Sequence, residues 1–189
     1  MSDRKQLAVI VDWYGPYNTL KEANMAAGDE YKDGLYMVIG RQRYQRGDSQ
    51  LQYLGISDSL CERLHECHRK IQKVTRERRL WLGVVSSLFG SGRPKLEQVE
   101  WAYIYFLQLP LNEKKKTTPP QIEITVTNRW WNKVPEWNRL KRPHEDWPDI
   151  IDYSVCHEYA RVGSLGSWVE EWARDDFVNP VIRPQRRKK

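Results

Sequence analysis

The chain has 189 residues, of which 40% are hydrophobic and 12% aromatic, which is typical of a globular protein and excludes a disordered one. No apolar run approaches the roughly 20 residues of a membrane-spanning helix, and residues 1–6 lead into no signal-peptide apolar region, so we expect a cytoplasmic protein without membrane contact. Three scattered cysteines without a CxxC pair fit a reducing compartment.

The net charge of +6 is distributed unevenly along the chain. Between residues 144 and 176 nine acids oppose two arginines, so this segment carries −7 and the remainder carries +13. A basic body of this kind favours a polyanionic partner such as nucleic acid. The alternative is an ordinary solvated surface with a basic tail at residues 183–189.

The first part of the chain predicts alternating strands and helices. Residues 7–14 are an apolar run that predicts a strand, and 18–27 predicts a short helix that is capped by Asn18 or Thr19 and ends before Gly28. Residues 34–55 predict a hairpin, with two apolar runs joined by a polar, basic loop. Residues 57–74 carry apolar side chains at i, i+4, i+7 and i+11, which predicts one continuous helix.

The remaining elements predict an α+β protein. Residues 80–89 predict a buried strand, 96–112 a helix ending near Pro110, and 122–127 a strand with period-two character. From residue 128 the chain holds six of its nine tryptophans and the whole nine-acid segment. We expect irregular, aromatic-packed structure there, with a short helix near 164–176.

Glu100 has an unusual position on the helix predicted over 96–112. At about 100° of rotation per residue, Leu96, Ile104 and Leu107 lie near Glu100, whereas Ala102 and Phe106 face the other way. The carboxylate is therefore predicted on the buried stripe, where an ionised group needs a partner. That partner is either an arginine or backbone amide inside the core, or a metal ion.

Five landmarks within residues 33–116 follow one another in an order and at spacings that resemble the GIY-YIG nuclease domain. They are Gly34-Leu35-Tyr36, Tyr53-Leu54-Gly55, Arg63 eight residues later, Glu100, and Pro110 with Asn112. The resemblance implies a small core over 33–127, in which a short antiparallel sheet is flanked by helices. Residues 1–32 would then be an N-terminal strand–helix addition, and 128–189 an aromatic, acidic extension ending in a basic tail.

The chain also departs from the pattern of that family. Ile56 follows the second motif where a lysine or serine is common, and the lysine that some relatives carry before the arginine is absent. Some relatives have a histidine four residues after the arginine, where this chain has Cys67. These departures leave the general base unassigned.

The resemblance implies a metal-dependent endonuclease that hydrolyses DNA phosphodiester bonds. Glu100 would bind Mg²⁺ or Mn²⁺, and Arg63 would hold the scissile phosphate. Tyr36 and Tyr53 would position water and phosphate, with Tyr36 as the candidate base. The predicted helix places His65 and His68 on the flank opposite Arg63, as a surface pair poorly placed to act as base. The alternative is a catalytically inactive nucleic-acid-binding or assembly protein on the same fold.

Basic side chains near these landmarks are the candidate DNA contacts, because lysine and arginine position proteins on phosphates. They are Arg41, Arg43 and Arg46 in the hairpin loop, Lys70 on the predicted helix, and Lys114, Lys115 and Lys116 after the Glu100 helix. The C-terminal extension is a candidate interface for a homodimer or another protein. Most of its tryptophans are expected in a core or interface, rather than stacked on bases.

Overall fold

The computed structural model describes residues 6–65, 68–86, 92–133, 137–140, 143–144, 147–157 and 159–163. The elements that these residues form follow in chain order. They are β1 (Gln6–Tyr17), α1 (Leu20–Glu30), β2 (Gly34–Gln42), β3 (Gln50–Ser57), α2 (Leu60–Arg63), α3 (Arg69–Gln72), β4 (Val74–Ser86), α4 (Arg93–Leu107), β5 (Glu123–Lys133), β6 (Trp137–Leu140), β7 (Ile150–Ser154) and β8 (Tyr159–Gly163).

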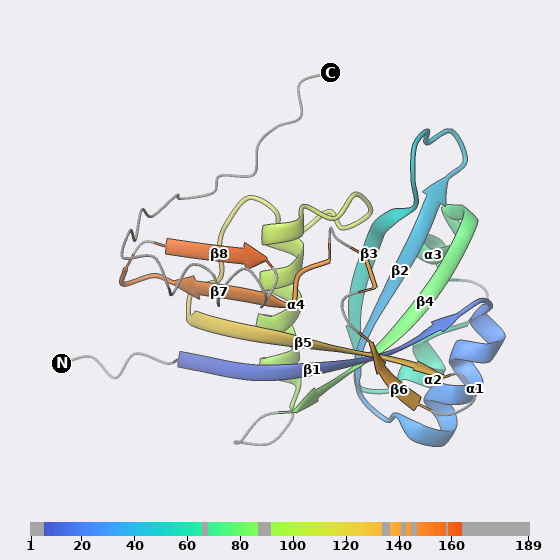
Figure 1. Ribbon diagram of the computed structural model, residues 1–189, viewed down its shortest axis with the longest axis horizontal. Coiled ribbons are helices and arrows are strands. Elements are labelled where there is room, and N and C mark those ends of the chain that lie inside the picture. The colour runs from blue at the N-terminus through green and yellow to red at the C-terminus, as the bar shows by residue number, and fades with distance from the viewer. Residues whose placement is uncertain are drawn as a thin grey trace.

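The strands of the described residues join in one twisted sheet (Figure 1). The strand order is β3-β2-β4-β1-β5-β7-β8, and β6 pairs with β5 beside this path. β1 and β5 run parallel, whereas the other neighbouring strands run antiparallel. The sheet is therefore mixed, and the strand nearest the N-terminus lies in its interior.

The predicted fold class, a small antiparallel sheet flanked by helices, was wrong. Among the described residues, strand residues outnumber helical residues two to one, and the sheet extends far beyond the predicted hairpin. β1 is not an appendage, because it pairs with β4 on one side and with β5 on the other. An apolar run such as residues 7–14 is typical of an interior strand. The run does not reveal which strands become its neighbours, and that choice determines the size of the sheet.

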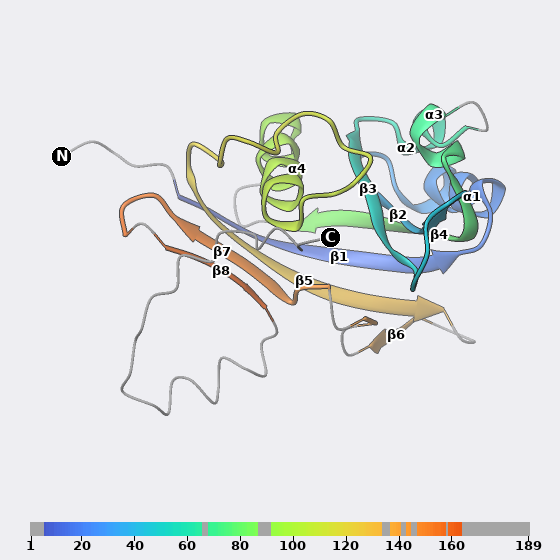
Figure 2. The ribbon, with the colours of Figure 1, turned by 90° about the horizontal axis from the view of Figure 1, so that it is seen from above.

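Alternate residues of β2 pack into two different layers. Leu35, Met37 and Ile39 belong to the hydrophobic cluster that includes the buried face of α4. Tyr36 and Val38 belong to the cluster formed with α1, α2 and α3. Figure 2 shows α4 set apart from this group of three helices. Neighbouring residues of the first landmark therefore point into different environments.

Local signals predicted several elements correctly. The hairpin is formed by β2 and β3, and Thr19 caps α1 by accepting a hydrogen bond from the Glu22 amide at 3.1 Å. The single helix over 57–74 was wrong, because α2 ends at Arg63 and α3 begins at Arg69. Of the predicted apolar residues, Leu60, Leu64 and Ile71 are buried, so both short helices still face the core, and Cys67 lies outside the described residues.

The C-terminal part is more regular than predicted. β6, β7 and β8 lie where irregular structure was expected. These strands have only four or five residues, which is too short for an alternating pattern to be recognised in the sequence. Trp130 and Trp147 are buried against Trp13 and Trp81, as expected for a core role. The helix predicted near 164–176 and the basic tail lie outside the described residues. No helix in the described part of the chain is long and apolar enough to cross a membrane.

Candidate active site

Tyr36 is the most deeply buried of the predicted catalytic residues. It lies on β2, directly opposite Gly55 of β3, and its side chain is fully buried. A Cβ atom at position 55 would lie 2.6 Å from the Tyr36 Cζ and hydroxyl oxygen. Any side chain there would displace the phenol ring, so the glycine of the second motif makes room for the tyrosine of the first.

Two donors converge on the Tyr36 hydroxyl oxygen. Arg63 donates from Nε at 3.0 Å, and His68 Nε2 lies 2.9 Å away. His68 Nδ1 accepts a hydrogen bond from the Ile71 amide at 3.3 Å, so the imidazole proton is on Nε2 and points at the phenol. Because its oxygen accepts from both groups, the Tyr36 hydroxyl can direct its own proton to a third partner.

Tyr53 completes a compact group of side chains that we call the tyrosine cluster: Tyr36, Tyr53, Arg63 and His68. The Tyr53 ring centroid lies 5.9 Å from that of Tyr36 and 5.6 Å from that of His68. Tyr53 is half-buried and Arg63 is exposed, whereas Tyr36 and His68 are buried. The cluster thus extends from the core to the surface.

The environment fixes the protonation states in this cluster. Burial raises the pKa of Tyr36 above its usual value, and the neighbouring Tyr53 raises it further. Burial, followed by the charge of Arg63, lowers the pKa of His68 to about 4. The hydrogen bond to Tyr36 raises the pKa of Arg63. At neutral pH the arginine is charged and the phenol and imidazole are neutral, which disfavours Tyr36 as a base.

The prediction that His68 lies at the surface was wrong, because it assumed a helix running through residues 57–74. The chain instead breaks after α2, and His68 becomes the N-cap of α3 with its ring against Tyr36. No proline or glycine marks this break. The only signal was weak: histidine and cysteine, which dominate residues 65–68, have modest helix propensity.

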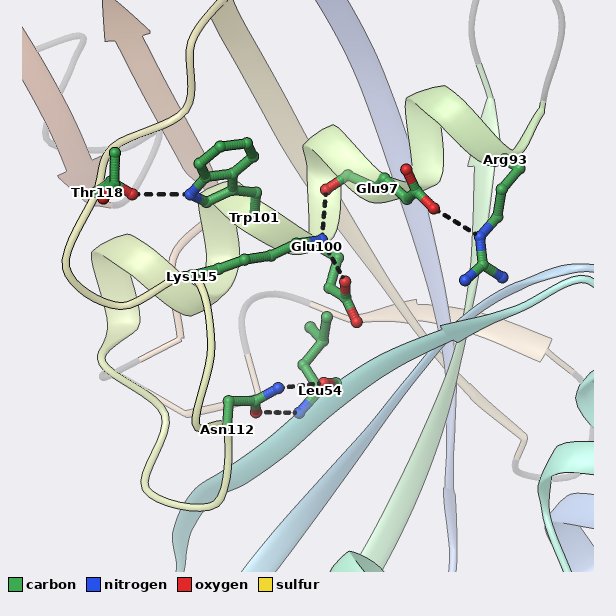
Figure 3. Close-up of polar contacts among 8 residues, drawn as sticks. All are labelled: Leu54, Arg93, Glu97, Glu100, Trp101, Asn112, Lys115 and Thr118. Atoms are coloured by element: carbon green, nitrogen blue, oxygen red, sulfur yellow. Dashed lines mark hydrogen bonds and ion pairs between the residues drawn. The ribbon is translucent and has the colours of Figure 1, made fainter.

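Glu100 lies at the margin of the buried face of α4. Leu96 and Ile104 are buried as predicted, but Ala102 is buried too, so the buried face is turned away from the predicted one. The Glu100 side chain is 16% exposed, and its Oε2 accepts a hydrogen bond from Lys115 Nζ at 2.7 Å (Figure 3). The partner of this carboxylate is therefore the ammonium group of Lys115, which the sequence analysis had predicted to contact DNA.

The loop after α4 is fastened back over the helix. Lys115 also donates to the Glu97 carbonyl at 3.3 Å, and the Trp101 indole donates to the Thr118 carbonyl at 2.8 Å (Figure 3). Lys115 has a φ of 62°, in the left-handed region that costs a non-glycine residue on the order of 1 kcal/mol. The contacts of the loop offset this strain and hold the ammonium against Glu100.

Asn112 connects the same loop to β3. Its Oδ1 accepts from the Leu54 amide at 3.0 Å, and its Nδ2 donates to the Leu54 carbonyl at 2.7 Å (Figure 3). The Leu111 amide also donates to the Gln52 carbonyl at 2.8 Å. The asparagine of the last landmark therefore has a structural role, because it pairs with the outer edge of β3 next to Tyr53.

The structure brings three of the four predicted catalytic residues together. Tyr36, Tyr53 and Arg63 lie in the layer of α1, α2 and α3, whereas α4 packs on the opposite face of β2. Among the described residues, no hydrogen bond, ion pair or ring contact joins Glu100 to the tyrosine cluster. Glu100 nevertheless reaches the β3 region through the loop that Asn112 fastens to Leu54 (Figure 3).

The predicted DNA contacts divide into two groups. Exposed side chains that extend from the surface are Arg43, Arg46 and Lys114. Side chains engaged within the chain are Arg41 with Glu77, Lys70 with Glu113, Lys115 with Glu100, and Lys116 with the Leu109 carbonyl. The second group stabilises loops, so its members are weaker candidates for phosphate binding.

The side chains present limit the kind of metal site that is feasible. The described part of the chain contains no group of three or more histidine, cysteine or acidic side chains that could hold a metal ion. Glu100 offers one carboxylate, and Lys115 engages one of its oxygens. This donor set fits a hydrated Mg²⁺ or Mn²⁺ ion bound through a single carboxylate, and it does not fit a site built from several protein ligands.

No protein-family model matches this chain, and neither does any curated protein or solved structure. The resemblance to the GIY-YIG nuclease domain therefore depends on the sequence landmarks and on the contacts among them.

Proposed function

We propose that this chain is a metal-dependent endonuclease that hydrolyses phosphodiester bonds of DNA, as its resemblance to the GIY-YIG nuclease domain implies. The observation that carries the proposal is the convergence of Arg63 and His68 on the hydroxyl of Tyr36, with Tyr53 beside them. Packing alone would not require an exposed arginine to bind a buried phenol. Side chains from β2, from β3 and from the segment of α2 and α3 are held in one polar arrangement, as a reaction site needs.

Each residue of the cluster has a role that follows from its contacts. Arg63 keeps its charge and is exposed, so its remaining N–H groups can bind the scissile phosphate and offset the charge that develops on it. Tyr36, which is fully buried and bonded to Arg63, would orient the guanidinium toward the phosphate. Tyr53, half-buried beside it, can contact the same water or phosphate.

Glu100 would hold the Mg²⁺ or Mn²⁺ ion. The ion, when bound, would lower the pKa of a bound water and withdraw charge from the phosphate. Because Lys115 engages Oε2 of the same carboxylate, a cation bound through the other oxygen would lie next to its ammonium, and the repulsion between the two positive charges would weaken cation binding.

The alternative function is a catalytically inactive nucleic-acid-binding or assembly protein on the same fold. The Glu100–Lys115 ion pair favours it, because this pair neutralises the carboxylate without a metal. Under this alternative the C-terminal extension would bind a second copy or another protein. Under either function we propose that the protein is cytoplasmic and that its nucleic-acid partner is DNA.

Cleavage of supercoiled plasmid DNA with Mg²⁺ or Mn²⁺ tests the proposed activity. We expect nicked or linear product, and Glu100→Gln should lower the rate by at least about 100-fold, since it removes the charge that binds the cation. Glu97→Gln is the matched control, because Glu97 lies on the same helix but pairs with Arg93 at the surface. Full activity of Glu100→Gln would remove this residue from the mechanism.

Binding of Mn²⁺, followed by electron paramagnetic resonance, separates the two functions without relying on cleavage. Lys115→Met removes the competing ammonium and should tighten Mn²⁺ binding by about 3- to 10-fold. Glu100→Gln should abolish that binding. If wild type and Lys115→Met bind no Mn²⁺ and cleave no DNA, the inactive alternative is the better description.

A further inference from the structure

The tip of the β2–β3 hairpin carries a strongly exposed aromatic ring. The seven residues 43–49 connect the two strands and project beyond the sheet (Figure 1). Within them Tyr44 is 84% exposed, which is more than any other large hydrophobic side chain of the described residues. Exposure of a single ring is common on protein surfaces, so it carries no inference without further observations.

The first further observation is that the tip is held in one conformation by buried polar contacts. Gln52 is fully buried, and its Nε2 donates to the Gly40 carbonyl at 2.8 Å and to Gln45 Oε1 at 2.7 Å. Gln45 Oε1 also accepts a hydrogen bond from the backbone amide of Gln42 at 3.1 Å. A buried glutamine on β3 thus fixes the residue that follows Tyr44.

Arginines fasten the same tip from the outside. Arg76 of β4 donates to the Gln42 carbonyl at 3.1 Å and also binds the Gln45 carbonyl. Arg41 donates to the Gly47 carbonyl at 3.0 Å and pairs with Glu77. The backbone on both sides of Tyr44 is therefore preorganised, which lowers the entropy that a partner must overcome to bind it.

The second observation is the chemistry around the ring. The Arg43 guanidinium lies over the Tyr44 ring, with its Cζ 5.3 Å from the ring centroid. Arg43 and Arg46 are both exposed, and Asp48 is the acid among the tip residues. An aromatic ring flanked by cations is the combination that binds single-stranded nucleic acid, because the ring stacks on a base and the cations contact phosphates.

A flat ring discriminates between paired and unpaired DNA. Bases in an intact duplex are already stacked on their neighbours and present only their edges in the grooves. An unpaired base offers a π-face to the ring. From these contacts we propose that the hairpin tip binds unpaired bases of the DNA substrate, with Tyr44 stacking on a base and Arg43 and Arg46 contacting the adjoining phosphates.

This inference rests on the proposed function and narrows its substrate to DNA that contains a loop, gap or branch. The tip joins β3 at Gln50, and Gln50 lies three residues before Tyr53 of the cluster. Tyr44 lies six residues beyond Val38, the β2 partner of Tyr53, so at about 3.3 Å per residue the backbones of the two tyrosines are at most about 20 Å apart. That distance corresponds to about five nucleotides of a strand, so the unpaired bases would lie close to the cleaved bond.

Fluorescence anisotropy in EDTA, which prevents cleavage, tests the inference with two labelled duplexes of equal length. One is fully paired, and the other contains a central loop of unpaired bases. Wild type should prefer the looped duplex, and Tyr44→Ala should weaken binding to it by about 5- to 100-fold while changing the paired duplex little. Tyr44→Phe keeps the ring and should bind as wild type does.

Met25→Ala is the matched control, because Met25 is 59% exposed on α1, away from the tip. A 2-aminopurine placed in the loop adds a direct readout, since stacking on Tyr44 should quench its fluorescence with wild type and Tyr44→Phe but not with Tyr44→Ala. The salt dependence should be equal in all variants, because no charge is changed.

Three outcomes overturn the inference. If Tyr44→Ala binds the looped duplex as wild type does, the ring does not contact the bases. If Tyr44→Ala lowers the affinity for both duplexes equally, the ring does not recognise unpaired bases. If wild type binds neither duplex, the proposed function fails together with this inference, whereas the first two outcomes leave the proposed function intact.

Discussion

One oxygen atom, that of the Tyr36 hydroxyl, organises the candidate active site. Arg63 and His68 both direct a donor at it, and each of these side chains is oriented by a different short helix. His68 can fill this role only in its neutral form with the proton on Nε2, because Nδ1 accepts from the Ile71 amide. Protonation of His68 would place a second positive charge next to Arg63, so the site is sensitive to acid.

Folding stability should therefore fall as the pH drops. The unfolded chain takes up a proton on His68 near its ordinary pKa of about 6.5, whereas burial lowers the pKa of the folded form to about 4. Between about pH 7 and pH 5 the unfolded state binds more protons, and the free energy of unfolding should decrease by about 2 kcal/mol. Urea unfolding followed by tryptophan fluorescence at both pH values measures this loss.

Two histidine variants isolate this contribution. His68→Gln keeps a polar side chain that does not titrate, and it should lose most of the pH dependence over that range. His65→Gln changes an exposed histidine three residues earlier, and this variant should retain the pH dependence of the wild type. An unchanged pH dependence in His68→Gln would assign the acid sensitivity to other groups.

At the scale of elements, β3 depends on a side chain for its outer edge. It is the terminal strand of the sheet, so one side of its backbone would present unpaired N–H and C=O groups that invite association with other chains. Asn112 pairs with both polar groups of Leu54 and thereby imitates a short neighbouring strand. It also fixes the start of the loop that carries Lys115 to Glu100.

Asn112→Ala should lower the free energy of unfolding by about 2–3 kcal/mol. Both hydrogen bonds are buried, and their loss leaves the Leu54 amide and carbonyl without partners. Gln121→Ala, at an exposed position near the start of β5, should change it by less than about 0.5 kcal/mol. Urea unfolding compares the two, and a loss at Asn112 as small as that at Gln121 would show that water replaces the amide.

Elements with a strong local signal could be predicted from the sequence, and those set by distant contacts could not. The β2–β3 hairpin and the Thr19 cap follow from turn and capping chemistry within a few residues. The break before His68 carries only a weak local signal, and the bond of its ring to Tyr36 joins residues 32 positions apart in the sequence. The resemblance singled out Tyr36 and Arg63, which are in contact, whereas the contact of Lys115 with Glu100 depends on a loop conformation that the sequence pattern does not specify.

At the scale of the whole molecule, the sheet crosses both predicted boundaries, at residues 32/33 and 127/128. β1 comes from the first predicted segment and lies between β4 and β5, and β5 itself runs through the second boundary. Trp13, Trp81 and Trp147 come from the three segments and belong to one hydrophobic cluster. A core shared in this way couples the stability of the segments.

We therefore expect the protein to unfold in a single cooperative transition. Far-ultraviolet circular dichroism and tryptophan fluorescence should give the same midpoint in urea. Val11→Ala, at a fully buried position of β1, should lower the free energy of unfolding by about 2 kcal/mol for both probes, because it opens a cavity in the shared core. Ile10→Ala, one residue earlier and 37% exposed, should cost clearly less. Two separate transitions, or a shift of only one probe in Val11→Ala, would show that the predicted segments fold independently despite their common sheet.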